Sequence, residues 1–153
     1  PAEPLFIYRV RDCPGRPGVT DDLPTALSGP DVRMARIVHD GGDADADVRV
    51  LATNVTVADS FLAKARGLMF RRSFPDGSAL VFPFDGTAAR TLHMVAVPFD
   101  IDAVWLRGER VERVARLSAW TGVGRATADT VIELPAGAAA GVHEGDTVRI
   151  DSE

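Results

Sequence analysis

The sequence predicts an all-β domain, either a β-sandwich or a barrel-like roll, with one short α-helix after the first strands. Short runs rich in β-branched residues recur at short intervals, and clusters of turn residues separate them, a spacing typical of sandwiches and barrels. One segment carries the start and stop signals of a helix. Strands do not alternate with helices as they do in parallel α/β folds, and the chain holds neither a repeat nor a heptad pattern.

The chain of 153 residues is predicted to consist of an extended arm and one compact domain. In residues 1–33, prolines and glycines recur so often that no helical or strand period persists. Met34 then opens a segment typical of a folded domain, so we expect a single β-domain over residues 34–153. One hypothesis is that Met34 is the natural start and that the arm is not native. The alternative is a genuine N-terminal extension.

The first half of the domain is expected to begin with a strand over residues 35–39, followed by an acidic, solvated turn. Residues 48–57 alternate and are rich in β-branched side chains, so they predict a strand or a pair of strands. The helix is expected next, over residues 58–67. Asp59 or Ser60 is suited to cap its free amides, and Gly67 is suited to end it in the left-handed conformation.

Strands are predicted throughout the remainder of the domain. They are expected over residues 79–84, 92–97, 101–106, 110–117, 130–134 and 146–150. Pro83 indicates an edge or a bulge in the first of these strands, because proline cannot donate to a sheet. The turn Arg107-Gly108-Glu109 predicts a hairpin between the third and the fourth.

The composition limits the functional classes. A net charge of -5 disfavours nonspecific binding to nucleic-acid phosphates. No apolar run approaches the ~20 residues that span a bilayer, and the N-terminus lacks the layout of a signal peptide. We therefore expect a cytoplasmic protein with neither a nucleic-acid nor a membrane partner. Lys64 is the only lysine beside 16 arginines, and aspartate outnumbers glutamate 16 to 6. This balance favours a salt-tolerant source, such as a halophilic archaeon, or a GC-rich genome.

Four stretches, taken in order, resemble a family known as domain of unknown function 192 (DUF192). They are Ala58-Asp-Ser with Ala65-Arg-Gly-Leu-Met-Phe-Arg71, Ala79-Leu-Val-Phe82, Met94 with Asp102, and Glu133-Leu-Pro-Ala-Gly137 with Gly145-Asp146. The resemblance implies a compact all-β structure with a short helix, and it transfers no reaction. The chain departs from the family pattern at His93, where the family has tryptophan, and at Val95–Val97, where it has Lys-Asn-Thr.

Arg66, Asp102 and Glu133 are the charged residues of the candidate site. A planar guanidinium suits a carboxylate through two parallel hydrogen bonds, so Arg66 is predicted to pair with Asp59, Asp102 or Glu133. The favoured interpretation is an internal ion pair, because buried charges are usually paired; the alternative is an anion-binding arginine. Asp102 and Glu133 both lie in apolar β context, where two carboxylates with separated pKa values can act as acid and base.

His93, Met94 and the segment Trp120–Arg125 complete the candidate site. His93 suits a general base or a metal ligand. No two of the three histidines share a ligand spacing, so a partly buried structural histidine is favoured. Met94 suits either a pocket wall or the core. Trp120 and Arg125 frame a glycine-bearing loop that suits the rim of a binding site, since loops carry binding residues more often than cores do.

We therefore expect a small β-domain that binds a small polar or anionic ligand without chemistry. The residues expected near the ligand are Arg66, His93, Met94, Asp102 and Glu133, with Trp120 and Arg125 at the rim. No cofactor and no metal are predicted, and the oligomeric state is left open. The alternatives are a hydrolase that uses Asp102 and Glu133, and an accessory protein-interaction domain.

Overall fold

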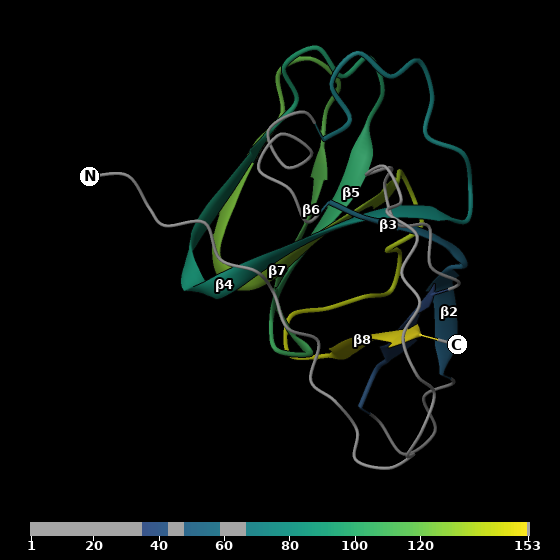
Figure 1. Cartoon of the computed structure of the whole chain (residues 1–153), viewed down its shortest axis with the longest axis vertical. Helices are drawn as coiled ribbons and strands as arrows, with labels where there is room; N and C mark the ends of the chain where they lie inside the picture. The colour runs from purple at the N-terminus through teal and green to yellow at the C-terminus, as the bar shows by residue number, and fades with distance from the viewer. Residues whose placement is uncertain (1–34, 43–47, 59–66, 153) are drawn as a thin grey trace, which may run out of the picture.

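The computed structural model describes residues 35–42, 48–58 and 67–152, in which eight β-strands form one sheet (Figure 1). The strands are β1 (Ala35–Asp40), β2 (Arg49–Ala52), β3 (Asn54–Val57), β4 (Ser78–His93), β5 (Ile101–Arg107), β6 (Arg110–Leu117), β7 (Val123–Pro135) and β8 (Thr147–Ser152). Their order across the sheet is β2-β1-β8-β6-β5-β7-β4-β3. Neighbouring strands are antiparallel, except that β3 and β4 are parallel.

The two edge strands of the sheet are consecutive in the chain, because only Thr53 separates β2 from β3. β1 and β3 are in contact although they lie near opposite edges of the sheet. The sheet therefore curls back on itself instead of forming two packed layers.

The hydrophobic core has two parts, one on each side of the sheet. Every strand contributes to the first cluster, including Ile37 of β1 and Val55 of β3. Since strands from both edges meet in it, this cluster fills the inside of the curl. The second cluster covers the other side of β4, β5 and β7, where Trp105 packs together with Leu68 and Met94 from two loops.

The predicted fold class is wrong about the helix, because the described residues contain strands and no helix. Residues 59–66, most of the segment expected to be helical, lie outside the described residues. At its start, the Ala58 amide donates to the carbonyl of Val81 at 2.8 Å, which extends the pairing of β3 with β4. At its end, residues 67–70 form a turn. The sheet thus takes the amide of the first residue that was expected to be helical.

The predicted strands are confirmed in part. The hairpin of β5 and β6 is confirmed, and Gly108 in its turn has a positive φ of 62°. Residues 79–84 and 92–93, predicted as parts of two strands, belong to the single strand β4. The irregularity predicted at Pro83 is present, since the pairing of β4 with β7 shifts between Pro83 and Ala88. β7 begins at Val123, in a segment that was predicted to be a loop.

Gly124 is a position where the backbone of β7 passes close to buried side chains. A Cβ atom added there would lie 2.5 Å from Cη2 of Trp105 and 3.2 Å from a methyl group of Leu117. Trp105 is fully buried, and its indole N–H donates to the carbonyl of Arg90 at 2.9 Å. The ring is therefore held in place and cannot move away from a larger residue at position 124.

We predict that Gly124→Ala lowers the free energy of unfolding by about 1–3 kcal/mol, because the added methyl group overpacks the core against Trp105. Urea denaturation would measure the change. Gly86→Ala is the matched control, since no atom lies within 4 Å of a Cβ added at Gly86. Equal losses of stability in the two variants would contradict the explanation.

Candidate functional site

Asp102 lies at the start of β5 and is buried among hydrogen-bond donors. Its carboxylate accepts from Nε of Arg116 at 2.8 Å, and from the backbone amides of Gly137 and Ala139 at 2.8 and 3.1 Å. Arg116 is the residue directly opposite on β6, and the hydrogen bond to Asp102 raises the pKa of its guanidinium. Asp102 thus joins β5, β6 and the turn after β7, which is a structural role.

The two candidate carboxylates do not form a catalytic pair. Asp102 lies opposite Leu134 across the β5–β7 ladder, and Glu133 lies opposite Ala103. Successive residues of a strand point to opposite faces of the sheet. The Asp102 side chain is therefore on the side of the first core cluster, whereas Glu133 is on the side of the second. One substrate cannot contact both, so the hydrolase alternative has no geometric support.

We predict that Asp102→Ala destabilises the fold by about 3 kcal/mol, because it leaves the amides of Gly137 and Ala139 without their acceptor. Chemical denaturation is the appropriate measurement. Arg116→Ala serves as the comparison and should cost less, since the side chain of Arg116 is 55% exposed and leaves no buried donor behind. A larger loss in Arg116→Ala would show that the ion pair, and not the bonding to the turn, is the important contact.

Glu133 is the unusual charged residue of the sheet. It is 5% exposed, and its Oε2 atom has no hydrogen-bond partner within the described part of the chain. Burial raises the pKa of its carboxyl to about 8, while the positive charge of Arg71 acts in the opposite direction. At neutral pH the group is therefore mostly a neutral acid, which can donate a hydrogen bond as well as accept one.

The loop that precedes β4 passes directly over Glu133. A Cβ atom added at Gly67 would lie 3.9 Å from both carboxyl oxygens of Glu133 and 3.4 Å from the ring of Phe82. Gly67 has a positive φ of 45°, a conformation for which glycine is favoured. The backbone at Gly67 thus lies beside the carboxyl, and the positive φ, rather than lack of space, is what favours glycine there.

The titration of Glu133 predicts how stability depends on pH. The folded protein keeps the proton up to a pH of about 8, whereas the unfolded chain loses it near the ordinary pKa of 4.5. The free energy of unfolding must therefore fall as the pH rises between these values. Glu133→Gln removes this contribution, so it should stabilise the protein relative to wild type near pH 8 by about 2–4 kcal/mol more than near pH 4.5. Denaturation at both pH values tests this, and parallel pH dependences would contradict it.

The other predicted site residues are dispersed. Arg66 lies outside the described residues. His93 is exposed at the end of β4, where its Nδ1 accepts from the amide of Val95 at 3.3 Å. Met94 is 1% exposed and belongs to the second core cluster. Trp120 and Arg125 are exposed, so the predicted rim residues do reach the surface.

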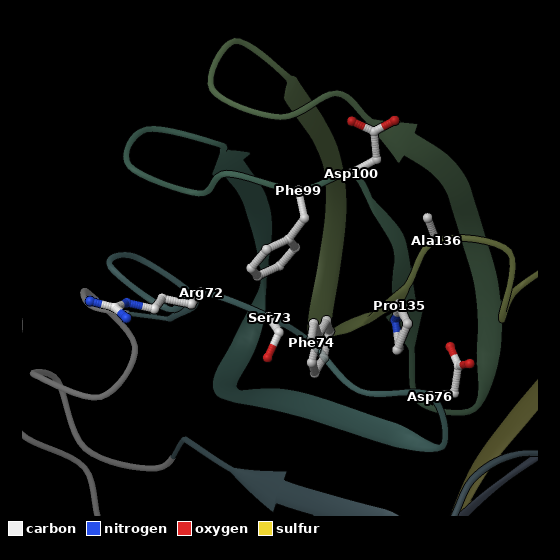
Figure 2. Close-up of a pocket in the computed structure, with 8 residues that line it drawn as sticks. All are labelled: Arg72, Ser73, Phe74, Asp76, Phe99, Asp100, Pro135 and Ala136. Carbon is white, nitrogen blue, oxygen red and sulfur yellow. The ribbon is translucent and has the colours of Figure 1, made fainter.

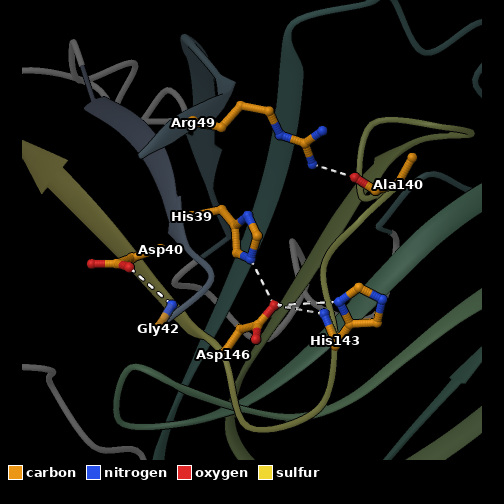
Figure 3. A network of polar contacts seen from close by, with 7 residues as sticks. All are labelled: His39, Asp40, Gly42, Arg49, Ala140, His143 and Asp146. Carbon is orange, nitrogen blue, oxygen red and sulfur yellow. Dashed lines mark hydrogen bonds and ion pairs between the residues drawn. The ribbon is translucent and has the colours of Figure 1, made fainter. Parts of the chain in front are cut away.

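A histidine–aspartate contact far from Glu133 could not be foreseen from the sequence. Nε2 of His39 lies 2.7 Å from Oδ2 of Asp146, although the two residues are 107 positions apart (Figure 3). The same oxygen accepts from the amide of His143 at 2.8 Å. Burial acts to raise the pKa of Asp146, but these hydrogen bonds and the charges of both histidines outweigh it, so the pKa is lowered. The contact fastens β1 to the turn before β8.

A surface groove opens between two loops at the end of β7 (Figure 2). It has a volume of about 440 Å³, and its lining residues are Arg72, Ser73, Phe74, Asp76, Phe99, Asp100, Pro135 and Ala136. The rings of Phe74 and Phe99 lie 6.3 Å apart between centroids and pack against the second core cluster. We call this the Phe74–Phe99 groove; its volume lies within the range of small-molecule sites.

Charged residues of both signs border the groove. Arg72 and Asp76 lie on opposite sides of the two rings (Figure 2), and neither forms an ion pair with another described residue. Asp100 accepts from the amide of Ala119 at 2.8 Å. Pro135 is two residues beyond Glu133 on the same side of β7, so the Cα atoms of the two residues are about 7 Å apart along the strand.

Sequence reasoning missed Phe74 and Phe99. A signal was present, because each of them adjoins a proline and lies within two residues of an aspartate in a loop, Phe74-Pro-Asp76 and Pro98-Phe-Asp100. Among residues 35–42, 48–58 and 67–152, no cluster of histidine, cysteine or acidic residues is suited to hold a metal ion. In the same ranges, no helix has the length and hydropathy that crossing a membrane requires.

A model of the DUF192 family, described as uncharacterized ACR, matches residues 43–150. A similar solved structure is that of a protein of unknown function from Novosphingobium aromaticivorans DSM 12444, with a TM-score of 0.61 and 23% identity over 74% of this chain and 83% of that one. Another is a putative transcription regulator from Sinorhizobium meliloti 1021, with a TM-score of 0.63 and 20% identity over 81% of this chain and 98% of that one. At these identities the likeness concerns the fold alone. No curated protein matches the chain.

Proposed function

The chain belongs to the DUF192 family, which is uncharacterized, and from this starting point we propose that it binds a small zwitterionic ligand with an apolar side group, without chemistry. The ligand would occupy the Phe74–Phe99 groove. The observation that supports the proposal is the combination of an apolar floor with charged side chains of opposite sign at its borders. An amino acid or a short peptide has the complementary groups.

Each part of the groove would bind one part of such a ligand. The rings of Phe74 and Phe99, with Pro135, offer an apolar surface for a side group. The guanidinium of Arg72 points away from the two rings in Figure 2; turned toward the groove, it would suit a carboxylate through paired hydrogen bonds. Asp76 lies on the opposite side of the rings (Figure 2) and suits an ammonium group. The mixed charges favour a zwitterion over a simple anion, which the aspartates would repel.

A panel of three small probes tests the proposal. Phenylalanine carries both charges, phenylpropionate only the carboxylate, and phenethylamine only the ammonium group. We expect phenylalanine to raise the melting temperature of the purified full chain more than either analogue at equal concentration, because ligands of the native state stabilise it by mass action. Isothermal titration calorimetry would then give the affinities. The absence of binding by all three probes would overturn the proposal.

Substitutions separate the roles of the groove residues. Phe99→Ala should lower the affinity of the protein for all three probes. Arg72→Gln should lower the affinity for phenylalanine and for phenylpropionate about tenfold, because one charge-assisted hydrogen bond is lost. The affinity for phenethylamine should not change. Arg149→Gln changes an arginine of β8 and is the matched control. Equal effects of Arg72→Gln and Arg149→Gln would show that binding does not use the groove.

A further inference from the structure

Exposed apolar side chains gather on three loops at one end of the sheet. Seven large apolar residues are exposed in the described part of the chain, and four of them lie here: Phe70 at 72%, Val95 at 56%, Trp120 at 59% and Val123 at 65%. Phe70 lies in the loop before β4, Val95 in the loop after β4 and Trp120 in the loop after β6, whereas Val123 begins β7. The three loops meet at the top of the view in Figure 1. We call Phe70, Val95, Trp120 and Val123 the loop-tip surface.

Hydrogen bonds between the loops hold the loop-tip surface together. The amide of Phe70 donates to the carbonyl of Ala96, and the amide of Trp120 donates to the carbonyl of Val97, both at 2.9 Å. Phe70, Ala96 and Trp120 are also the three non-glycine residues of the described chain with positive φ, between 58° and 67°. Side chains adopt this conformation only where the surroundings impose it. Two of these three positions are thus the exposed aromatic residues Phe70 and Trp120.

The charge of the loop-tip surface differs from that of the whole chain. The net charge of the chain is -5, yet residues 67–72, 94–97 and 118–123 contain no acidic side chain and two arginines, Arg71 and Arg72. Asp100 borders the surface, and its Oδ1 is occupied by the amide of Ala119. With two arginines against one bordering aspartate, the exposed aromatic residues lie beside a small excess of positive charge.

We propose that the loop-tip surface places this protein on an anionic lipid bilayer, with Phe70 and Trp120 at the interface and Arg71 and Arg72 near the headgroup phosphates. Tryptophan and phenylalanine favour the boundary between headgroups and acyl chains, and basic residues are attracted to anionic lipids. Protruding loop tips suit a fluid surface better than the flat, complementary contact that a protein partner requires.

This proposal replaces the sequence-based expectation that the protein has no membrane partner. That expectation considered segments that span a bilayer, whereas binding at the interface requires only exposed apolar groups and nearby positive charge. The loop-tip surface and the ligand groove share Arg72, which lines the groove, whereas Phe70 and Trp120 do not line it.

Vesicle binding by the full chain tests the proposal. We expect co-sedimentation with vesicles of phosphatidylglycerol and phosphatidylcholine in equal parts, weaker binding at high salt, and little binding to phosphatidylcholine alone. The chain has two tryptophans, of which Trp105 is fully buried, so a blue shift of the emission on binding would report Trp120. The absence of co-sedimentation with the anionic vesicles would overturn the proposal.

The double variant Phe70→Asn/Trp120→Asn locates the binding surface. Asparagine is polar and tolerates positive φ, so the loops should keep their shape, which thermal melting would verify. We expect about a hundredfold loss of vesicle affinity, since each of the two aromatic residues contributes about tenfold. Val50→Asn/Ile150→Asn replaces two exposed apolar residues on β2 and β8 and should bind as wild type does.

Two further outcomes would contradict the proposal. Unchanged vesicle binding by the double variant would mean that another surface contacts lipid. A dimer of the wild-type chain that the double variant no longer forms, measured by analytical ultracentrifugation, would mean that a second copy covers the loop-tip surface.

Discussion

The burial of β5 and β7 on both sides is the constraint on which the rest of the structure depends. Every residue of β5 from Ile101 to Leu106 is buried, as is every residue of β7 from Val131 to Pro135. A strand covered on both sides excludes polar groups unless they are hydrogen-bonded or neutral. The strands contain two exceptions, and each satisfies this condition differently. Asp102 remains near the strand end, where backbone amides reach it, whereas Glu133 lies deeper and retains its proton.

On the side of the sheet that carries the second core cluster, loop residues form part of the core. Leu68 and Met94 are buried beneath that surface, at 2% and 1% exposure, and each lies within two residues of an exposed apolar neighbour, Phe70 or Val95. The buried residue anchors the loop, and the exposed one is held outward by a left-handed backbone at or beside it. The Phe74–Phe99 groove exists on the same side because its two aromatic rings cover the second cluster only partly. Both candidate binding surfaces therefore lie on a sheet face that, within the described residues, is covered by loops.

The β-rich character and the hairpin of β5 and β6 could be predicted because both arise from local signals, namely β-branched runs and the Arg107-Gly108-Glu109 turn. The length of β4 could not, because Pro83 and the small residues that follow indicate a break, and only pairing with distant β7 keeps them extended. The predicted helix is absent from the described residues: the amide of Ala58 continues the pairing of β3 with β4, and residues 67–70 form a turn.

For the candidate site too, some features could be predicted from local sequence, whereas others depend on tertiary structure. Trp120 and Arg125 were predicted at the surface from composition, and they lie there. The relation of Asp102 to Glu133 depends on strand register, which one sequence does not reveal, and the pKa of Glu133 depends on neighbours far along the chain. Phe74 and Phe99 meet only because two turns fold to the same end of β7. Residue type thus indicated candidates, and the pairing of strands decided which of them act together.

The junction at Thr53 has a consequence for association between molecules. The two strands at the sheet edges, β2 and β3, are four residues each. Exposed strand edges are templates for unwanted pairing with other chains, and short edges limit that hazard. In this protein both edges are supplied by one segment that turns at a single residue, so the eight-stranded sheet offers little unpaired backbone at either margin. The curl thereby gives protection against edge-to-edge aggregation without a fully closed barrel.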